Sequence, residues 1–369
     1  MWREWRNRLL MSPRFQRAAA AFPLTRFKAR REARELFDIV AGFTYSQIAL
    51  ACVRLGLLER LREGAVAECS LIASMQMSET AAHTLLRAAA AIDLLESCAN
   101  NGESAWMLGR RGAALLGNPG VLAMIEHHAV LYADLVDPIA MLRAPRGSTA
   151  LSKYWPYASA AIPGQVAGEG TRDYTTLMAA SQGLVAEEIL DAYPVSGHRR
   201  ILDVGGGDGT FLRAVAKRSP AIELMLFDLP GVAEMARRRF EERGLSHRAQ
   251  IFSGDFSRDA LPVGADLITL VRVLHDHDDP LVETLLRAAG QALPPGGRLV
   301  VAEPLAGTTG AERMGDAYFG IYLWAMGSGR PRSAEELEKM LKKTGFSRIE
   351  QLPTRIPLQT SVLVATKAG

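Results

Sequence analysis

The 369 residues are 48% hydrophobic and 22% charged, an ordinary composition for a soluble chain of two or three domains. Three widely spaced cysteines exclude a disulfide framework, a Cys-x-x-Cys redox site and a cysteine-based zinc site, and they indicate a reducing compartment. Asp38, Gln47 and Arg54 interrupt the most apolar stretch, residues 36–58, so we expect no membrane span. The first residues also lack the apolar core of a secretory signal.

Positive charge is concentrated at the N-terminus. Residues 1–34 carry a formal charge of +8, whereas the remainder carries −5. Aromatic and leucine side chains are interleaved with these bases, and Pro13 and Pro23 prevent one long helix. We favour a solvated basic arm or a dimer-swapped extension. Contact with an anionic membrane surface stays open, and nucleic acid is disfavoured because such an arm gains nothing from the aromatic content.

Helices are expected over most of the first half. Apolar residues recur three and four apart from about 34 to 116, Ser78 is a good N-cap, and residues 99–108 resemble a hairpin. Helices followed by a hairpin suggest a winged helix, but the acidic segment 68–96 disfavours DNA binding. Four further helical pieces are expected over 120–193, with breaks near Pro145-Arg-Gly and Ile162-Pro-Gly.

After residue 198, short apolar strands alternate with helical stretches, which predicts a doubly wound, mostly parallel sheet. The parallel strands are expected at 200–204, 222–227, 249–252, 267–273 and 298–302. Two closely spaced C-terminal strands, 349–352 and 361–367, leave no room for a crossover helix and should add to the sheet edge antiparallel. The chemistry is expected in loops at the carboxyl ends of the strands.

The strongest local signal is the run ILDVGGGDGTFL from Ile201, a buried strand leading into a glycine loop and then a helix. Glycine allows a sharp turn and a close approach to a ligand. Gly205, Gly207 and Gly209 follow the spacing G-x-G-x-G, so the dinucleotide pattern G-x-G-x-x-G is not met.

Two neighbouring strand tips carry carboxylates. Asp228 ends the second strand, where it can accept both hydroxyls of a ribose. Asp255 and Phe256 end the third strand and offer a carboxylate to an adenine amino group and an aromatic ring to the base. Three strand tips in register therefore predict an adenosine-binding site.

The order LDVGGGDG, FDLP, GDF and VRVLHDHDD resembles the class I S-adenosylmethionine-dependent O-methyltransferases of the caffeate and acetylserotonin type. The resemblance covers most of the chain and implies S-adenosylmethionine as the cofactor. It implies a catalytic His275 with Glu303, 28 positions later, in support. Within the same motifs, Asp203 and Arg272 are expected in the cofactor site. The chain departs from the family at Pro331, where many relatives have a second glutamate.

The resemblance also implies a domain organisation. It gives a basic arm over 1–34, a winged-helix-like dimerisation domain over 35–116, a helical connector with substrate-pocket helices over 117–197, and a Rossmann-like domain over 198–369. A homodimer is therefore expected. The protein is expected in the cytoplasm, at a membrane surface if the arm binds lipid.

Three further stretches resemble the carotenoid branch of the family: RNRLLMSPRFQ from Arg6, AGFTYSQ from Ala41 and MIEHHAVLYADL from Met124. Members of that branch methylate the tertiary hydroxyl of hydroxyneurosporene and demethylspheroidene. The favoured acceptor is therefore a hydrophobic carotenoid alcohol. The alternatives are an aromatic polyketide or phenol, a C-methylated chlorophyll precursor and, from another class, a ligand-responsive winged-helix regulator.

Proton removal is the chemical task of His275. A tertiary alcohol is far more basic than imidazole, so the histidine can take the proton only as the carbon–oxygen bond forms, and Glu303 would stabilise the imidazolium. The alternative is that His275 merely caps its strand, with Asp276 and Asp278 as solvated turn residues.

Other candidate residues lie on helices expected around the pocket. Relatives place a substrate-facing Met at Met178 and a polar contact to the cofactor at Ser181, and the rest are possible pocket residues: His127, His128, Phe319 and Tyr322. The two consecutive histidines point to different helix faces, and a structural role is favoured for both. No histidine and carboxylate cluster has ligand spacing, so no metal is expected.

Overall fold

The computed structural model describes residues 1–100, 102–154 and 182–369, and it divides into two units, Met1–Gly117 and Asn118–Gly369. The four-part division expected from the sequence stays a prediction. The elements of the first unit are, in chain order, α1 (Trp2–Met11), α2 (Pro13–Ala21), α3 (Arg26–Arg54), α4 (Leu57–Arg60), β1 (Val66–Ala67), α5 (Glu68–Ser74), α6 (Glu79–Ala91), β2 (Leu95–Asn100), β3 (Glu103–Leu108) and α7 (Arg110–Leu116).

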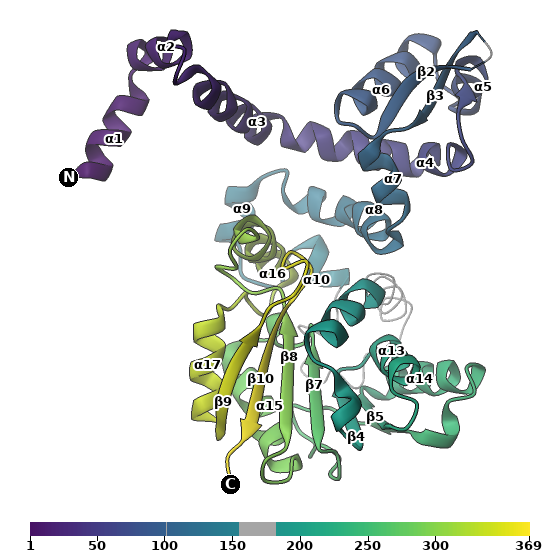
Figure 1. The fold of residues 1–369 in the computed structure, drawn as a ribbon, viewed down its shortest axis with the longest axis vertical. Coiled ribbons are helices and arrows are strands. Elements are labelled where there is room, and N and C mark those ends of the chain that lie inside the picture. The colour runs from purple at the N-terminus through teal and green to yellow at the C-terminus, as the bar shows by residue number, and fades with distance from the viewer. Residues whose placement is uncertain (101, 155–181) are drawn as a thin grey trace. The chain divides into compact units, whose positions relative to one another are not determined.

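The start of the basic arm folds as two short helices, as its prolines predict. The Ser12 side chain accepts the N–H of Phe15 at 3.4 Å, and Pro13 takes the first position of α2, where a missing N–H costs no intrahelical bond. Pro23 follows the end of α2. Figure 1 shows α1 and α2 at the N-terminal end of α3, away from the small sheet of this unit.

The 29-residue helix α3 changes character along its length, from basic at its start to apolar from Leu36 onward. By length and composition alone, α3 is long and apolar enough to cross a membrane, so the expectation of no membrane span stays a prediction. Core helices of soluble proteins meet the same criterion. Its first part, residues 36–43, is nevertheless largely exposed, and such a face needs a cover. Its exposed members are Leu36, Phe37, Ile39, Val40 and Phe43.

The remainder of the first unit is a small three-stranded sheet with short helices. The strand order is β1-β3-β2, and both pairs are antiparallel. The side chain of Ser78 caps α6 by accepting the N–H of Ala81 at 3.3 Å. The expected N-cap and hairpin are therefore confirmed.

The second unit opens with helices and continues as an alternation of strands and helices. Residues 182–192 are also helical. The named elements are α8 (Pro119–Asp134), α9 (Pro138–Arg143), α10 (Ala150–Tyr154), β4 (Arg200–Val204), α13 (Thr210–Arg218), β5 (Glu223–Asp228), α14 (Pro230–Glu242), β6 (Ala249–Ser253), β7 (Leu267–Val271), α15 (Asp279–Ala292), β8 (Arg298–Glu303), a π-helix (Arg313–Phe319), α16 (Gly320–Met326), α17 (Ala334–Lys343), β9 (Phe346–Leu352) and β10 (Ser361–Lys367).

A seven-stranded sheet organises this unit in the order β6-β5-β4-β7-β8-β10-β9. The first five strands pair in parallel, and β10 pairs antiparallel with both β8 and β9. The predicted doubly wound sheet with an antiparallel C-terminal edge is confirmed. The break expected near Pro145 separates α9 from α10, whereas the one near Pro163 lies outside the described residues.

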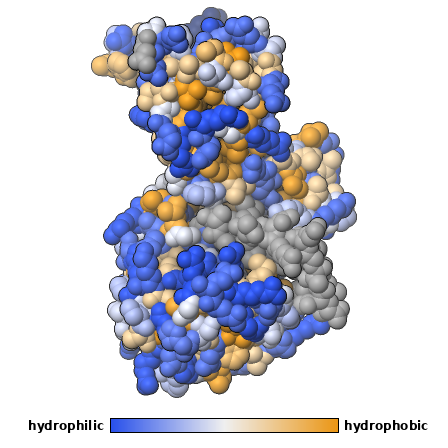
Figure 2. Space-filling view, turned by 90° about the vertical axis from the view of Figure 1, so that its right-hand side faces the viewer, coloured by the Kyte–Doolittle hydropathy of each residue, from blue (hydrophilic) through white to orange (hydrophobic). Residues whose placement is uncertain are grey.

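Apolar side chains cover both faces of the sheet, because successive residues of a strand point to opposite sides. Leu202 of β4 joins a core formed with α15 and α17, and its neighbour Ile201 joins a core formed with α13, α14 and the helix over 182–192. Helices cover both faces of the sheet. Polar groups at the carboxyl ends of the parallel strands therefore lie along one edge of the sheet. On the face of this unit shown in Figure 2, hydrophilic residues dominate and apolar patches are scattered.

Candidate active site

The glycine loop follows β4 and makes two close approaches of different kinds. Gly205, Gly207 and Gly209 all have positive φ values, of 69°, 59° and 80°. A Cβ on Gly205 would lie 2.8 Å from Cγ2 of Val273, so this glycine lets the loop pack against the tip of β7. Gly207 faces open space and donates its N–H to Asp228 at 2.8 Å. Gly207 is therefore the glycine with room for a ligand.

Asp203 is buried beneath this loop. Its Oδ1 accepts the hydroxyl hydrogen of Thr269 at 2.6 Å, whereas its Oδ2 has no hydrogen-bond partner among the described residues. Burial and, to a smaller extent, the charge of nearby Asp228 raise the pKa of Asp203 to about 7, against the hydrogen bond from Thr269, which lowers it. A buried, half-satisfied carboxyl is costly, so its unpaired oxygen suits a donor from a ligand.

The next two strand tips place the predicted adenosine contacts at the same edge. Asp228 accepts the N–H of Gly207 and, at 2.7 Å, that of Leu229, and burial raises its pKa to about 6. Asp255 accepts the N–H and hydroxyl of Ser257, at 2.9 and 2.6 Å, through Oδ1. Its buried Oδ2 has no partner among the described residues. The Phe256 ring is half-buried.

His275 and Glu303 form the centre of the site, at the tips of β7 and β8. The buried carboxylate of Glu303 accepts the N–H groups of Val273 and Leu274 through Oε1, at 2.9 and 2.6 Å. Its Oε2 is hydrogen-bonded to Nδ1 of His275. Both carboxylate oxygens are used, so the imidazole is fixed with Nδ1 towards Glu303. The predicted pair is in direct contact, and Nε2 is the ring nitrogen that Glu303 does not contact.

Asp276 adds a second carboxylate to the histidine. Its Oδ1 lies 3.2 Å from Nε2 of His275. Burial opposes protonation of His275, but Asp276 and Glu303 outweigh it and raise its pKa. The arrangement stabilises an imidazolium, which is the product of proton removal from an acceptor. Asp276 is mostly buried and in contact with the base, which corrects its interpretation as a solvated turn residue.

A strap of residues 327–332 holds the loop that carries His275. Arg332 is 2% exposed and donates to the carbonyl oxygens of Leu274 and His277, each at 2.7 Å, and to Asp279 at 2.6 Å. Gly329 has a φ of 74°, and a Cβ there would lie 2.0 Å from the carbonyl oxygen of His275. The strap therefore packs directly against the loop that carries His275.

Asp278 contacts this strap from the loop that follows His275. Its carboxylate accepts the N–H of Gly329 at 3.0 Å and an N–H of Arg146 at 3.2 Å. Arg146 in turn donates to the carbonyl oxygen of Gly329 at 2.8 Å and lies over the Trp324 ring. Asp278 is thus a turn residue whose carboxylate also holds the strap by hydrogen bonds.

Two histidines and two tyrosines line the neighbourhood of the base. Nε2 of His127 is hydrogen-bonded to the hydroxyl of Tyr322, and Nε2 of His128 to that of Tyr318, each at 2.7 Å. Burial lowers the pKa of His127 to about 4 and also lowers that of His128, so both are neutral at pH 7. The two histidines face different partners, as their consecutive positions predict.

Phe319 connects this group to the base. Its ring packs edge-on against His275, with centroids 5.7 Å apart, and against Tyr318 at 5.0 Å. Tyr318 and Phe319 end the π-helix, an element common at functional sites. Of these residues Tyr318 was missed, although its position four before Tyr322 places both on one helix face.

The remaining predicted residues are Arg272, which the structure describes, and Met178 and Ser181, which it does not. Arg272 stands at the tip of β7 with a φ of 58°, a strained value for a residue with a side chain, and its charge opposes the protonation of His275. Met178 and Ser181 lie outside the described residues. His277 packs edge-on against Phe256 at 5.2 Å, so the predicted adenosine contacts adjoin the loop that carries His275.

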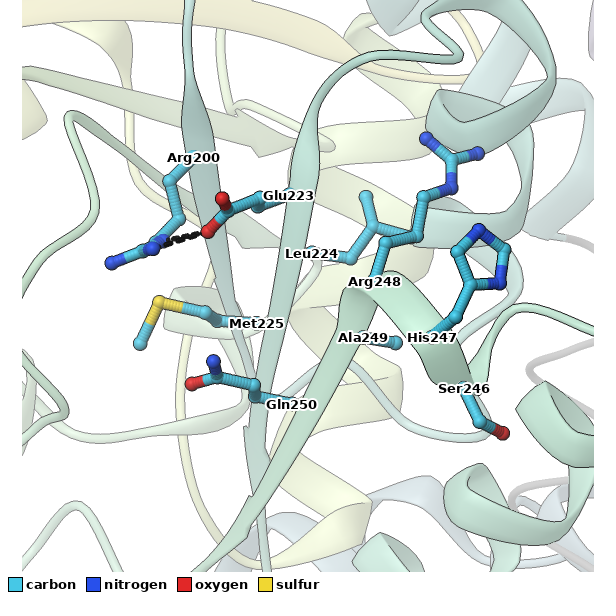
Figure 3. A pocket seen from close by; sticks show the side chains of 9 residues that line it. All are labelled: Arg200, Glu223, Leu224, Met225, Ser246, His247, Arg248, Ala249 and Gln250. Carbon is cyan, nitrogen blue, oxygen red and sulfur yellow. Dashed lines mark hydrogen bonds and ion pairs between the residues drawn. The ribbon is translucent and has the colours of Figure 1, made fainter.

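A polar pocket lies at the amino ends of β4, β5 and β6, opposite the strand tips that carry the candidate site. Figure 3 shows Arg200 and Glu223 paired at the starts of β4 and β5, beside the pocket residue Arg248. Arg248 donates to the carbonyl oxygens of Ala216 and Pro220, which is a structural role. This pocket contains none of the predicted site residues. Within the described ranges there is also no group of three potential metal ligands.

Comparisons with known proteins agree with this site. A family model of the O-methyltransferase domain matches residues 163–347. The chain is 44% identical to demethylspheroidene O-methyltransferase of Cereibacter sphaeroides, over 98% of this chain and 94% of that protein. It is 41% identical to the protein of the same name from Rhodobacter capsulatus, over 98% of this chain and 89% of that one. The chain belongs to the O-methyltransferase family. It is an S-adenosylmethionine-dependent O-methyltransferase, as the sequence motifs predict.

Solved structures share the whole fold. Human N-acetylserotonin methyltransferase, solved with S-adenosylmethionine, aligns with a TM-score of 0.75 at 21% identity, over 92% of this chain and 98% of that one. The mitomycin 7-O-methyltransferase MmcR aligns with a TM-score of 0.72 at 25% identity, over 93% and 100%. The residues of the methyltransferase fit the cofactor. Two buried carboxylate oxygens, of Asp203 and Asp255, await donors, and the open face of Gly207 lies beside Asp228.

Proposed function

We propose that this methyltransferase acts on the tertiary hydroxyl of a carotenoid, with demethylspheroidene or hydroxyneurosporene as acceptor. The observation that carries the proposal is the 44% identity over nearly the full length to a protein named for demethylspheroidene. The more distant relatives are named for other acceptors, such as mouse acetylserotonin O-methyltransferase at 27% identity. The resemblance of the stretches that begin at Arg6, Ala41 and Met124 to the carotenoid branch supports the same acceptor.

The chemistry of the site supports an alcohol as the acceptor. When bound, S-adenosylmethionine supplies a methyl group on a sulfonium, ready for in-line displacement. Nε2 of His275 takes the hydroxyl proton as the new carbon–oxygen bond forms, because the alcohol is far more basic than the imidazole. Glu303 and Asp276 then balance the imidazolium charge at Nδ1 and Nε2. Phe319, against the His275 ring, offers an apolar surface to the acceptor.

Incubation of the purified protein with S-adenosylmethionine and each acceptor tests the proposal. We expect demethylspheroidene or hydroxyneurosporene to give a product heavier by one CH2 group in liquid chromatography with mass detection. N-acetylserotonin and a hydroxylated anthracycline serve as phenolic acceptors. Turnover of a phenol without turnover of either carotenoid would refute the carotenoid proposal and favour the aromatic alternative.

We also propose that the enzyme is a homodimer. The support is the exposed apolar face of α3 from Leu36 to Phe43, which is uncharged except for Asp38. Faces of this kind are covered in stable assemblies. Sedimentation of the full chain should give twice the mass of 40.1 kDa. A fully active monomer would contradict the proposal.

A further inference from the structure

Helix α1 and the segment after α2 carry exposed aromatic residues. Trp2 and Trp5 of α1 are 69% and 53% exposed. Phe22, between α2 and α3, is 55% exposed, and Phe27, the second residue of α3, is 67% exposed. A soluble chain gains nothing from leaving four large aromatic rings in water, so this end of the first unit is built to contact something.

Helix α1 is amphipathic, with its aromatic residues on one face. Trp2, Trp5 and Leu9 are spaced i, i+3 and i+7, which places them on one face. The two indole rings stack with centroids 5.0 Å apart. A turn of about 100° per residue places Arg6 and Arg8 on either side of this face. Bases that flank an aromatic face are typical of a helix that lies in the plane of a membrane surface.

The charge around these rings is not balanced locally. Five arginines of α1 and α2 are exposed, and within the described part of the chain none of them is within 4 Å of a carboxylate. They are Arg3, Arg6, Arg8, Arg14 and Arg17. Glu4, the one acid of α1, lies 3.7 Å from the amino group of Met1. The segment therefore offers a positive potential together with its apolar face.

We propose that α1, α2 and the turn to Phe27 form a docking surface for anionic lipid bilayers. The aromatic rings enter the interfacial region of the bilayer, and the flanking arginines contact the acidic headgroups. This inference does not rest on the identity of the acceptor. It does give an advantage with any long apolar acceptor, because it brings the site to the phase in which such molecules dissolve.

A second copy of the chain is a poorer partner for this surface. Two arms in contact would bring charges of +8 together, and like charges oppose association. The apolar face of α3 is free of bases from residue 35 to residue 53, so it is the better match for another copy. Nucleic acid would satisfy the charge but would leave the apolar face of α1 without a match.

Vesicle flotation of the full-length protein tests the proposal. Vesicles of phosphatidylcholine are compared with vesicles that also contain phosphatidylglycerol. We expect binding to the anionic vesicles at least about tenfold tighter than to the neutral ones, and release by high salt. Activity on a detergent-dispersed acceptor should not change when the arm is altered, so loss of docking and loss of catalysis are read separately.

Two sets of variants separate the aromatic and the basic contributions. Trp2→Ser with Trp5→Ser should reduce binding at least about tenfold, as should Arg3→Gln, Arg6→Gln and Arg8→Gln together. The matched controls replace exposed residues of the second unit, Val136→Ser with Val263→Ser, and Arg143→Gln, Lys217→Gln and Arg243→Gln together. The controls should bind vesicles like the unaltered protein.

Four results would overturn the proposal. The first is equal binding to neutral and anionic vesicles, and the second is equal loss in the arm variants and their controls. The third is salt-resistant membrane attachment that survives the arm variants, which would assign membrane contact to α3 instead. Binding of the arm to RNA but not to anionic vesicles would assign it to nucleic acid.

Discussion

Replacing His275 by Gln should remove the base while leaving the fold and the cofactor site in place. General-base catalysis contributes about 10²–10⁴-fold, so the transfer rate should fall by this factor, or about 3–5 kcal/mol of barrier. The assay is a single-turnover methyl transfer at saturating S-adenosylmethionine, with enzyme in excess over acceptor. Cofactor affinity, measured by calorimetry, should stay nearly unchanged.

Glu303→Gln tests how the base is oriented. Three N–H groups point at the Glu303 carboxylate, from Val273, Leu274 and the His275 ring. If the amide oxygen keeps the two backbone bonds, its NH2 group faces Nδ1 of His275 and forces the ring proton onto Nε2. The base atom is then blocked, and the rate should fall in the same direction, by about 10²-fold or more.

The double variant decides whether the two residues act as one device. With the imidazole gone, Glu303 has no ring left to orient, so the double variant should be no slower than His275→Gln alone. Thermal unfolding is the control, because a lost backbone bond to Glu303 costs about 1–3 kcal/mol of stability even when catalysis is already lost. Fully additive losses in rate, or a His275→Gln enzyme that keeps most of its activity, would refute the reasoning.

Three further variants test the surroundings of the base and the cofactor site. His275 must be neutral to act as a base, and its pKa is raised above the usual histidine value of about 6.5. The rate should therefore fall as the pH drops through that raised pKa. Asp276→Asn should move this fall in the pH–rate profile to lower pH, because Asp276 helps to raise the pKa. Asp228→Ala should weaken S-adenosylmethionine binding by about 1.5–3 kcal/mol in calorimetry, and unchanged affinity would remove Asp228 from the site. Arg332→Met should lower the melting temperature and reduce the rate about tenfold at unchanged cofactor affinity, with partial rescue by Arg332→Lys; a stable variant of full activity would show that the strap does not position the base.

The strands were predictable from the sequence because a strand buried on both faces has a continuous run of apolar residues. β4 and β10 have the predicted bounds. β7 is shorter than predicted and ends at Val271. The next residue, Arg272, has a φ of 58° and donates its N–H to Ala302 at 2.8 Å. Nothing in the local sequence indicates that an arginine adopts a positive φ, so the apolar Val273 favours a strand that continues to residue 273.

The contact between His275 and Glu303 was predictable because the family motifs place the two residues, 28 positions apart, at adjacent strand tips. The residues that hold the pair were not predictable in this way. Arg332 reaches Leu274 across 58 positions, and Tyr318 reaches His128 across 190. Neither contact follows from periodicity or from spacing within an element. Only the packing of the strap and of the π-helix against the strand tips brings these residues together.

The surroundings of His275 show how a site with Pro331 in place of the second glutamate still supports an imidazolium. In this chain two residues supply the support separately. Arg332 fixes the backbone of the catalytic loop, and its own positive charge is balanced by Asp279 at 2.6 Å. Asp276 supplies the second negative charge, 3.2 Å from Nε2. Because Asp276 is next to the base in the chain, its position depends on the loop that Arg332 holds, so the strap acts on the charge balance of the base as well as on its geometry.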